Sequence, residues 1–175
     1  MDLIKLFLLG AMGYLLAGFF DFAQIRKSRV LSYLFSVGFA LAALPYPILI
    51  SRFPSPHPSP LSRLLLALVI ISAVATIYVA TVEIPLRHKT PGTVYNRGTY
   101  KRIRHPGFLA HLVFNLFFSL YCYTAAITLL CIFFVLCNLV LVAIEDVFLF
   151  PQLFPDYPTY KQTTGFILPK IRGHR

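Results

Sequence analysis

The sequence predicts an all-α, polytopic membrane protein with about five transmembrane helices, and three observations lead to this fold class. Of its 175 residues, 58% are apolar and 13% are charged, a composition far from the average of soluble proteins. Long apolar runs alternate with short polar connections. Most of the 16 lysines and arginines fall in connections on one side of the predicted membrane. The chain length fits a single domain, residues 1–175.

Three spans are expected in residues 1–90. The apolar runs cover residues 3–22, 31–50 and 64–82. About 20 residues at about 1.5 Å per residue cross a hydrocarbon core of roughly 30 Å, so each run is close to the length of one crossing. The positive residues follow the first run instead of preceding it, which disfavours a signal peptide.

Small residues, prolines and an acid mark features within these spans. Gly13 and Ala17 are four residues apart in the first span, a pair that permits close helix packing. Pro45 and Pro47 are expected to bend or end the second helix, because proline lacks a backbone N–H. Glu83 follows the third span, either at the mouth of a site or as a marker of the water boundary.

A further apolar run, residues 107–150, is too long for a single crossing. As one helix it would extend over roughly 66 Å at about 1.5 Å per residue. We therefore predict two antiparallel helices that form a hairpin and turn near residues 121–124.

The basic residues predict the orientation of the five spans. When the loops are taken alternately, only Lys5, Arg52 and Arg63 fall on one side of the membrane, and all the others fall on the opposite side. Basic residues are enriched in cytoplasmic loops. The sequence thus predicts an external N-terminus and a cytosolic C-terminus, with the polar stretch before residue 107 also in the cytosol.

Composition also argues against two other classes of protein. The formal net charge of +10 comes from short basic pieces between apolar runs, and no nucleic-acid-binding motif is present, so we expect membrane lipids and not nucleic acid as partners. The three cysteines form no CxxC motif or Cys/His cluster. Neither a disulfide nor a metal site is predicted.

The densest cationic segment is residues 98–106, directly before the fourth span. It reads Gly-Thr-Tyr-Lys-Arg-Ile-Arg-His-Pro, and Pro106 suits the first turn of a helix while disfavouring helix at His105. A loop that enters a helix here would present cations and free backbone N–H groups to an anionic ligand. The alternative is a positively charged anchor that only sets the orientation of the protein.

Polar residues also occur inside the last two spans, where they are costly. His111, Asn115 and Ser119 are spaced four apart on one helical face, which fits either a ligand site or hydrogen bonds between helices. Glu145 and Asp146 lie near the cytosolic end of the fifth span. Acids at this depth usually face a cavity or a partner, and opposite Arg104 and His105 they suggest the two ends of a zwitterion site.

These residues carry a resemblance to a known family. Gly98-Thr99-Tyr100 followed by Arg104-His105-Pro106 is similar to the first motif of the isoprenylcysteine carboxyl methyltransferase and phospholipid methyltransferase group. The spacing of its second motif is matched by Glu145-Asp146, Leu149, Tyr157 and Tyr160. The resemblance covers about residues 98–171, and it departs where Leu153-Phe154-Pro155 replace a Phe-Gly step.

The resemblance implies S-adenosyl-L-methionine as cofactor and makes residues 91–175 the cofactor-binding half. It implies a membrane methyltransferase whose lipid or prenylated substrate enters sideways from the bilayer at the cytosolic face. The expected catalytic residues are Arg104 and Glu145. The expected cofactor-binding residues are Tyr100, Arg104, His105, Pro106, His111, Glu145, Asp146, Tyr157 and Tyr160.

Two other functions remain open from sequence. Sterol reductases carry a related His-Pro-Asn-Tyr pattern and use a nicotinamide cofactor, although Asn-Tyr does not follow His105-Pro106 here. A non-catalytic scaffold would use the polar residues only to pack helices. For a methyltransferase, the acceptor stays open between a carboxylate, an amine, a thiol and a sterol, and the oligomeric state stays open too.

Overall fold

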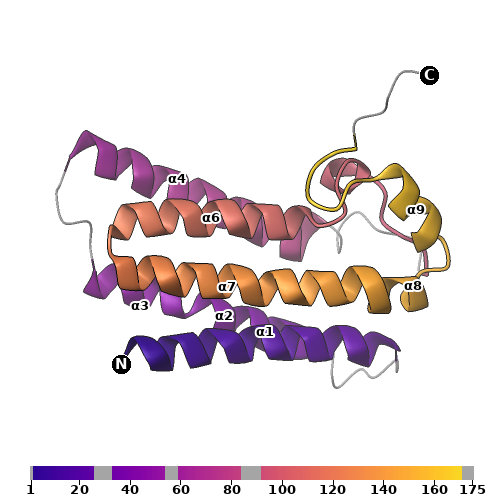
Figure 1. Ribbon diagram of the computed structural model, residues 1–175, viewed down its shortest axis with the longest axis horizontal. Coiled ribbons are helices and arrows are strands. Elements are labelled where there is room, and N and C mark those ends of the chain that lie inside the picture. Colours follow the sequence, from indigo (N-terminus) through magenta and orange to yellow (C-terminus); the bar gives the residue numbers. More distant parts are fainter. Residues whose placement is uncertain (1, 26–32, 54–58, 84–91, 171–175) are drawn as a thin grey trace.

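The chain folds into a bundle of helices, described here from a computed structural model that covers residues 2–25, 33–53, 59–83 and 92–170 (Figure 1). Within these ranges no residue belongs to a β-strand, which confirms the predicted all-α class. The elements are α1 Leu3–Ile25, α2 Tyr33–Ala43, α3 Pro45–Arg52, α4 Pro60–Ile77, η2 Tyr78–Glu83, η3 Gly98–Lys101, α6 Pro106–Cys122, α7 Ala125–Ile144, η4 Glu145–Leu149, α8 Phe150–Leu153 and α9 Tyr157–Thr163.

The apolar helices agree with the predicted spans. Among the described residues, four stretches are long and apolar enough to cross a membrane, namely Leu3–Phe20, Tyr33–Arg52, Pro60–Glu83 and Ala125–Leu153. α6 is apolar but shorter, with 17 residues. Many large apolar side chains on the outer faces of these helices are exposed, for example Leu8, Ile71 and Val140. Such faces are compatible with a membrane protein, because lipid tails are as apolar as the side chains.

Two predicted breaks occur where expected. The second apolar run splits into α2 and α3 at Leu44, and Pro45 starts the new helix, because its missing N–H cannot continue the old one. α6 and α7 run antiparallel beside each other (Figure 1). Tyr123 ends α6 in the left-handed conformation, with φ of 48°, so the chain reverses within the predicted 121–124 turn.

The small residues of the first span pack against the second helix. A Cβ atom added to Gly13 would lie 2.5 Å from the carbonyl oxygen of Gly38 and from the backbone nitrogen of Ala42. A Cβ on Gly38 would lie 2.9 Å from the nitrogen of Ala17. The two backbones are thus in direct contact, which confirms close packing through the Gly13 and Ala17 pair.

The hydrophobic core lies toward the end of the bundle opposite α9. Leu6, Phe118, Ile127 and Phe134 are almost completely buried, and they come from α1, α6 and α7 near the α6–α7 turn (Figure 1). The polar segments η3, η4, α8 and α9 gather at the other end. The proline-rich connection after α3 lies mostly outside the described residues.

Candidate functional site

The cationic segment before α6 forms a turn that enters the helix. Gly98 has a positive φ of 55° and begins the short 3-10 helix η3, a conformation that glycine adopts without steric cost. Pro106 is the first residue of α6, where its missing N–H has no partner to lose. Arg104 and His105 lie between the two helices, and both are buried. The prediction of a turn that enters the fourth helix is confirmed.

The C-terminal segment pairs with this turn through backbone hydrogen bonds. The N–H groups of Arg104 and His105 donate to the carbonyl oxygens of Gly165 and Phe166, at 2.8 and 3.2 Å. Gly165 in turn donates to the carbonyl of Arg102 at 3.3 Å. A Cβ on Gly165 would lie 1.6 Å from the carbonyl oxygen of Leu168, so only glycine fits this position. Residues 164–168, directly after α9, are therefore held against this turn and form one wall of the site.

Asp146 is the centre of a group that we call the Asp146 cluster, made of Arg104, His105, Asp146, Tyr157 and Lys161, in which all members except Lys161 are buried. Arg104 Nε and the Tyr157 hydroxyl both donate to Asp146 Oδ1 at 2.6 Å. His105 Nε2 lies 3.4 Å from the same oxygen, and Lys161 Nζ forms an ion pair with Oδ2. The side chains of Arg104 and Asp146 are 7% and 5% exposed, so their ion pair is shielded from water. Residues that lie 42 positions apart in the chain thus meet as predicted.

The neighbouring acid contacts the other edge of the same imidazole. Glu145 Oε2 lies 3.7 Å from His105 Nδ1, so the ring lies between the two acids. Both acids begin the π-helical turn η4, a rare conformation that is frequent at functional sites. Phe150 and Phe166 contact the imidazole ring, at centroid distances of 5.9 and 4.8 Å. Burial lowers the pKa of His105 from 6.5 despite the opposing effect of Asp146, so the ring is neutral at pH 7.

The predicted tyrosines join α9 to the turn before α6. The Tyr160 hydroxyl donates to the carbonyl oxygen of Tyr100 at 2.6 Å. Burial raises the pKa of Tyr160 to about 12. Burial also raises the pKa of Tyr100, and the nearby carboxylates of Glu83 and Glu145 add to this effect. Both hydroxyls therefore stay protonated and can donate hydrogen bonds at neutral pH.

His111 belongs to a second group, the His111 cluster of Tyr14, Tyr46, His111 and Asn115. His111 Nε2 lies 2.7 Å from the Tyr14 hydroxyl and 3.0 Å from Asn115 Nδ2. The Tyr46 hydroxyl donates to Asn115 Oδ1 at 3.0 Å. These contacts join α1, α3 and α6 inside the bundle. His111 thus forms hydrogen bonds between helices, one of the two uses considered for it. The other predicted site residues belong to the Asp146 cluster or lie beside it, as Tyr100, Pro106 and Glu145 do.

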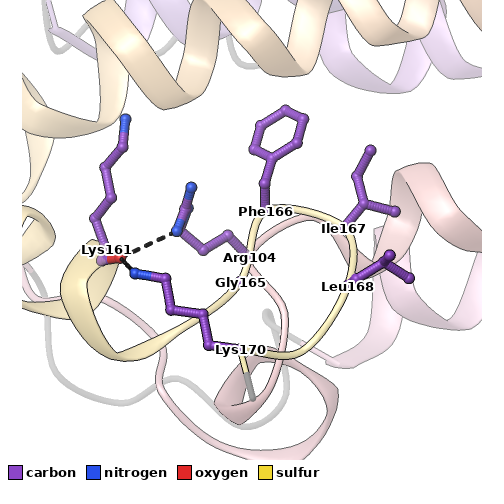
Figure 2. Close-up of a pocket in the computed structure, with 7 residues that line it drawn as sticks. All are labelled: Arg104, Lys161, Gly165, Phe166, Ile167, Leu168 and Lys170. Carbon is purple, nitrogen blue, oxygen red and sulfur yellow. Dashed lines mark hydrogen bonds between the residues drawn. The ribbon is translucent and has the colours of Figure 1, made fainter. Parts of the chain in front are cut away.

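An open groove of about 540 Å³ lies next to the Asp146 cluster. Its lining residues are Arg104, Lys161, Gly165, Phe166, Ile167, Leu168 and Lys170 (Figure 2). Figure 2 shows the C-terminal segment arching around the groove, with Lys170 reaching the carbonyl of Lys161. This volume lies within the range of ligand sites, and the lining combines cationic and apolar side chains. In the part of the chain that the structure describes, no group of His, Cys, Asp and Glu could hold a metal ion.

At this end of the bundle, Lys161 and Gly165 were not predicted from the sequence, and one of the two roles considered for Glu83 is wrong. Lys161 lies four residues after Tyr157, so the helical spacing alone places both side chains on one face of α9 and could have suggested Lys161. Gly165 had no such signal, whereas Glu83 was predicted either at the mouth of a site or at the water boundary. Glu83 is 1% exposed and accepts hydrogen bonds from Thr99, so it does not mark the water boundary.

Comparisons with known proteins identify no relative. No protein-family model matches the chain, and neither a curated protein nor a solved structure is significantly similar to it. Functional conclusions therefore depend on the geometry of this end of the bundle and on the motifs in the sequence.

Proposed function

We propose that the protein is an S-adenosyl-L-methionine-dependent membrane methyltransferase that acts on a lipid or lipidated acceptor. The observation that carries this proposal is the meeting of the two motif segments. Arg104 and His105 from the turn before α6 contact Asp146 and Glu145 at the end of α7, and α9 closes the group with Tyr157. A buried polar group of this kind, next to a groove, is a candidate for a ligand site.

The residues present fit the chemistry of the cofactor. Its carboxylate suits Arg104, Lys161 and Lys170 along the groove, and its amino or hydroxyl groups suit Glu145. Phe166 offers an aromatic surface for the adenine ring. When bound, the cofactor supplies an activated methyl group on a sulfonium.

In this proposal the protein orients the two reactants, supplies charged groups that bind them and excludes water from them. Methyl transfer is an in-line displacement, so orientation of the two reactants supplies most of the rate without a covalent enzyme intermediate. An acceptor carboxylate is already ionised and needs no base, whereas an amine must lose a proton. For an amine acceptor we propose Glu145, which lies 3.7 Å from His105 Nδ1 at the end of α7, as the candidate base.

We also propose that the helices span the membrane with the N-terminus outside and the Asp146 cluster on the cytosolic side. Two observations support this orientation. The basic residues of the loops are strongly asymmetric, and the turn before α6, α9 and the C-terminal segment all lie at one end of the bundle. Protease protection of tags placed at Met1 and Arg175 tests it, and protection of both tags or neither would contradict it.

Calorimetric titration of the purified protein with S-adenosyl-L-methionine tests the activity. We expect binding by the wild type and an affinity about tenfold to a hundredfold lower in Glu145→Gln, because a hydrogen bond to a charged group is lost. Asp156→Asn is a matched control, since the Asp156 carboxylate accepts the N–H of Val94, a residue outside the Asp146 cluster. Binding of NADPH instead would favour the reductase, and binding of neither would favour the scaffold.

A further inference from the structure

A third carboxylate is buried at this end of the bundle and has no role in the proposed reaction. Glu83 is the last residue of η2, and its side chain is almost completely buried. Its Oε1 accepts the backbone N–H of Thr99 at 3.0 Å, and its Oε2 accepts the Thr99 hydroxyl at 2.7 Å. A buried carboxylate is strongly unfavourable without such bonds. The pairing of Glu83 with Thr99 is therefore specific.

Gly98 leaves the space that the carboxylate fills. A Cβ atom on Gly98 would lie 2.0 Å from Glu83 Oε1, and the positive φ of Gly98 turns the N–H of Thr99 toward that oxygen. Glu83, Gly98 and Thr99 thus form one unit, which we call the Glu83 clamp. It fixes the first turn of η3 to the end of η2, the π-helical segment that follows α4.

The clamp lies at the start of the segment that carries Arg104 and His105. The Thr99 carbonyl accepts the N–H groups of Arg102 and Ile103, at 3.2 and 3.4 Å. Ile103 then pairs with Gly165. The backbone between the Glu83 clamp and the Asp146 cluster is therefore restrained by hydrogen bonds, so a displacement of Thr99 would also move the residues that follow it.

We propose that Glu83 is a positioning residue, which acts through Thr99 to hold Arg104 and His105 in place for the methyl donor. The effect on donor binding rests on the proposed function. The effect on the conformation of residues 98–105 does not, so the two are measured separately.

Hydrogen–deuterium exchange measures the clamp without any ligand. We expect amides in residues 98–105 to exchange about tenfold to a hundredfold faster in Glu83→Gln, because bonds to a charged acceptor weaken. Thr99→Val removes only the hydroxyl bond and should give a smaller increase, while Thr99→Ser should restore slow exchange. The control is Thr81→Val, which removes a hydroxyl that donates to the carbonyl of Ile77, four residues earlier in the chain. Unchanged exchange in both Glu83→Gln and Thr99→Val would overturn the proposal.

Titration with S-adenosyl-L-methionine then measures whether the position of Arg104 and His105 affects donor binding. Glu83→Gln and Thr99→Val should weaken binding, by about tenfold for Glu83→Gln, while Thr99→Ser and Thr81→Val bind as the wild type does. Fast exchange with normal affinity would reduce Glu83 to a structural role and overturn the proposal. If the wild type itself binds no donor while exchange responds as expected, the proposed function fails, and the hold of Glu83 on Arg104 and His105 is supported by exchange alone.

Discussion

The Asp146 cluster and the His111 cluster both consist of polar side chains buried against apolar helices, yet they are built differently. The Asp146 cluster combines charged groups from a turn, a π-helical segment and α9, all at the end of the bundle. The His111 cluster is made of neutral groups on α1, α3 and α6, inside the bundle. The two clusters thus differ in their position along the helices. The cluster at the helix ends is ionic and lies beside a groove, whereas the cluster inside the bundle holds helices together.

The energetics of the two clusters follow from this difference. Removing one partner of a buried ion pair leaves an uncompensated charge, and such changes cost about 3 to 5 kcal/mol. A neutral hydrogen bond between membrane helices contributes on average about 0.6 kcal/mol. The Asp146 cluster should therefore be much more sensitive to substitution than the His111 cluster.

The largest expected effect is that of Asp146→Asn. The substitution leaves Arg104 buried without its counter-charge, so we expect the free energy of unfolding to fall by about 3 to 5 kcal/mol. Tyr46→Phe is the matched change in the His111 cluster, because it removes one neutral hydroxyl, which bonds Asn115 at 3.0 Å and lies 3.5 Å from His111 Nε2, and it should cost about 0.5 to 1.5 kcal/mol. Denaturant titration in detergent micelles measures both. Equal losses would remove the distinction between the clusters.

Sequence reasoning found the helices because their signals are local. The lengths of the apolar runs, Pro45 and the turn near Tyr123 depend on the properties of neighbouring residues, and each predicted break is present. The acid pair and the Arg104-His105 pair were also predicted to face each other, because the order of the spans brings them to the same end.

The sequence was less informative where a role depends on contacts with distant segments. Spacing on α6 could not tell whether His111 faces a ligand or Tyr14, since the same face serves both. For Glu83 the sequence left a site mouth and the water boundary open, because its partner, Thr99, belongs to another segment. Gly165 has no pattern of its own, and its role depends on the later carbonyl of Leu168. Such contacts depend on tertiary packing, which no local pattern encodes.

A second, smaller effect compares the two histidines through donor binding. We expect His105→Gln to lower the affinity for S-adenosyl-L-methionine about tenfold to a hundredfold, and His111→Gln to leave it within about twofold. Both changes also disturb packing, since His105 contacts Phe150 and Phe166, and His111 contacts Tyr14. Stability therefore cannot separate them, but calorimetric affinity can. Equal losses of affinity in the two variants would indicate that His111 also belongs to the cofactor site.

The smallest expected effect is a pH dependence that belongs to His105. Because burial lowers the pKa of this imidazole in the folded protein, the unfolded chain binds more protons once the pH falls below about 6.5. The free energy of unfolding should then decrease as the pH falls, by at most about 1.4 kcal/mol per pH unit for one proton. The groups that face the ring are Glu145 and Asp146 at its edges, with Arg104 and Lys161 nearby.

His105→Gln isolates this effect, because glutamine does not titrate. Unfolding measured from pH 7.5 to pH 5.5 should show a shallower decrease for His105→Gln than for the wild type, and the difference between the two curves is the contribution of His105. If the two acids outweighed burial, protonation of His105 would stabilise the folded state. The wild type would then gain stability relative to His105→Gln as the pH falls, and the imidazole would have to be treated as a cation held between two carboxylates.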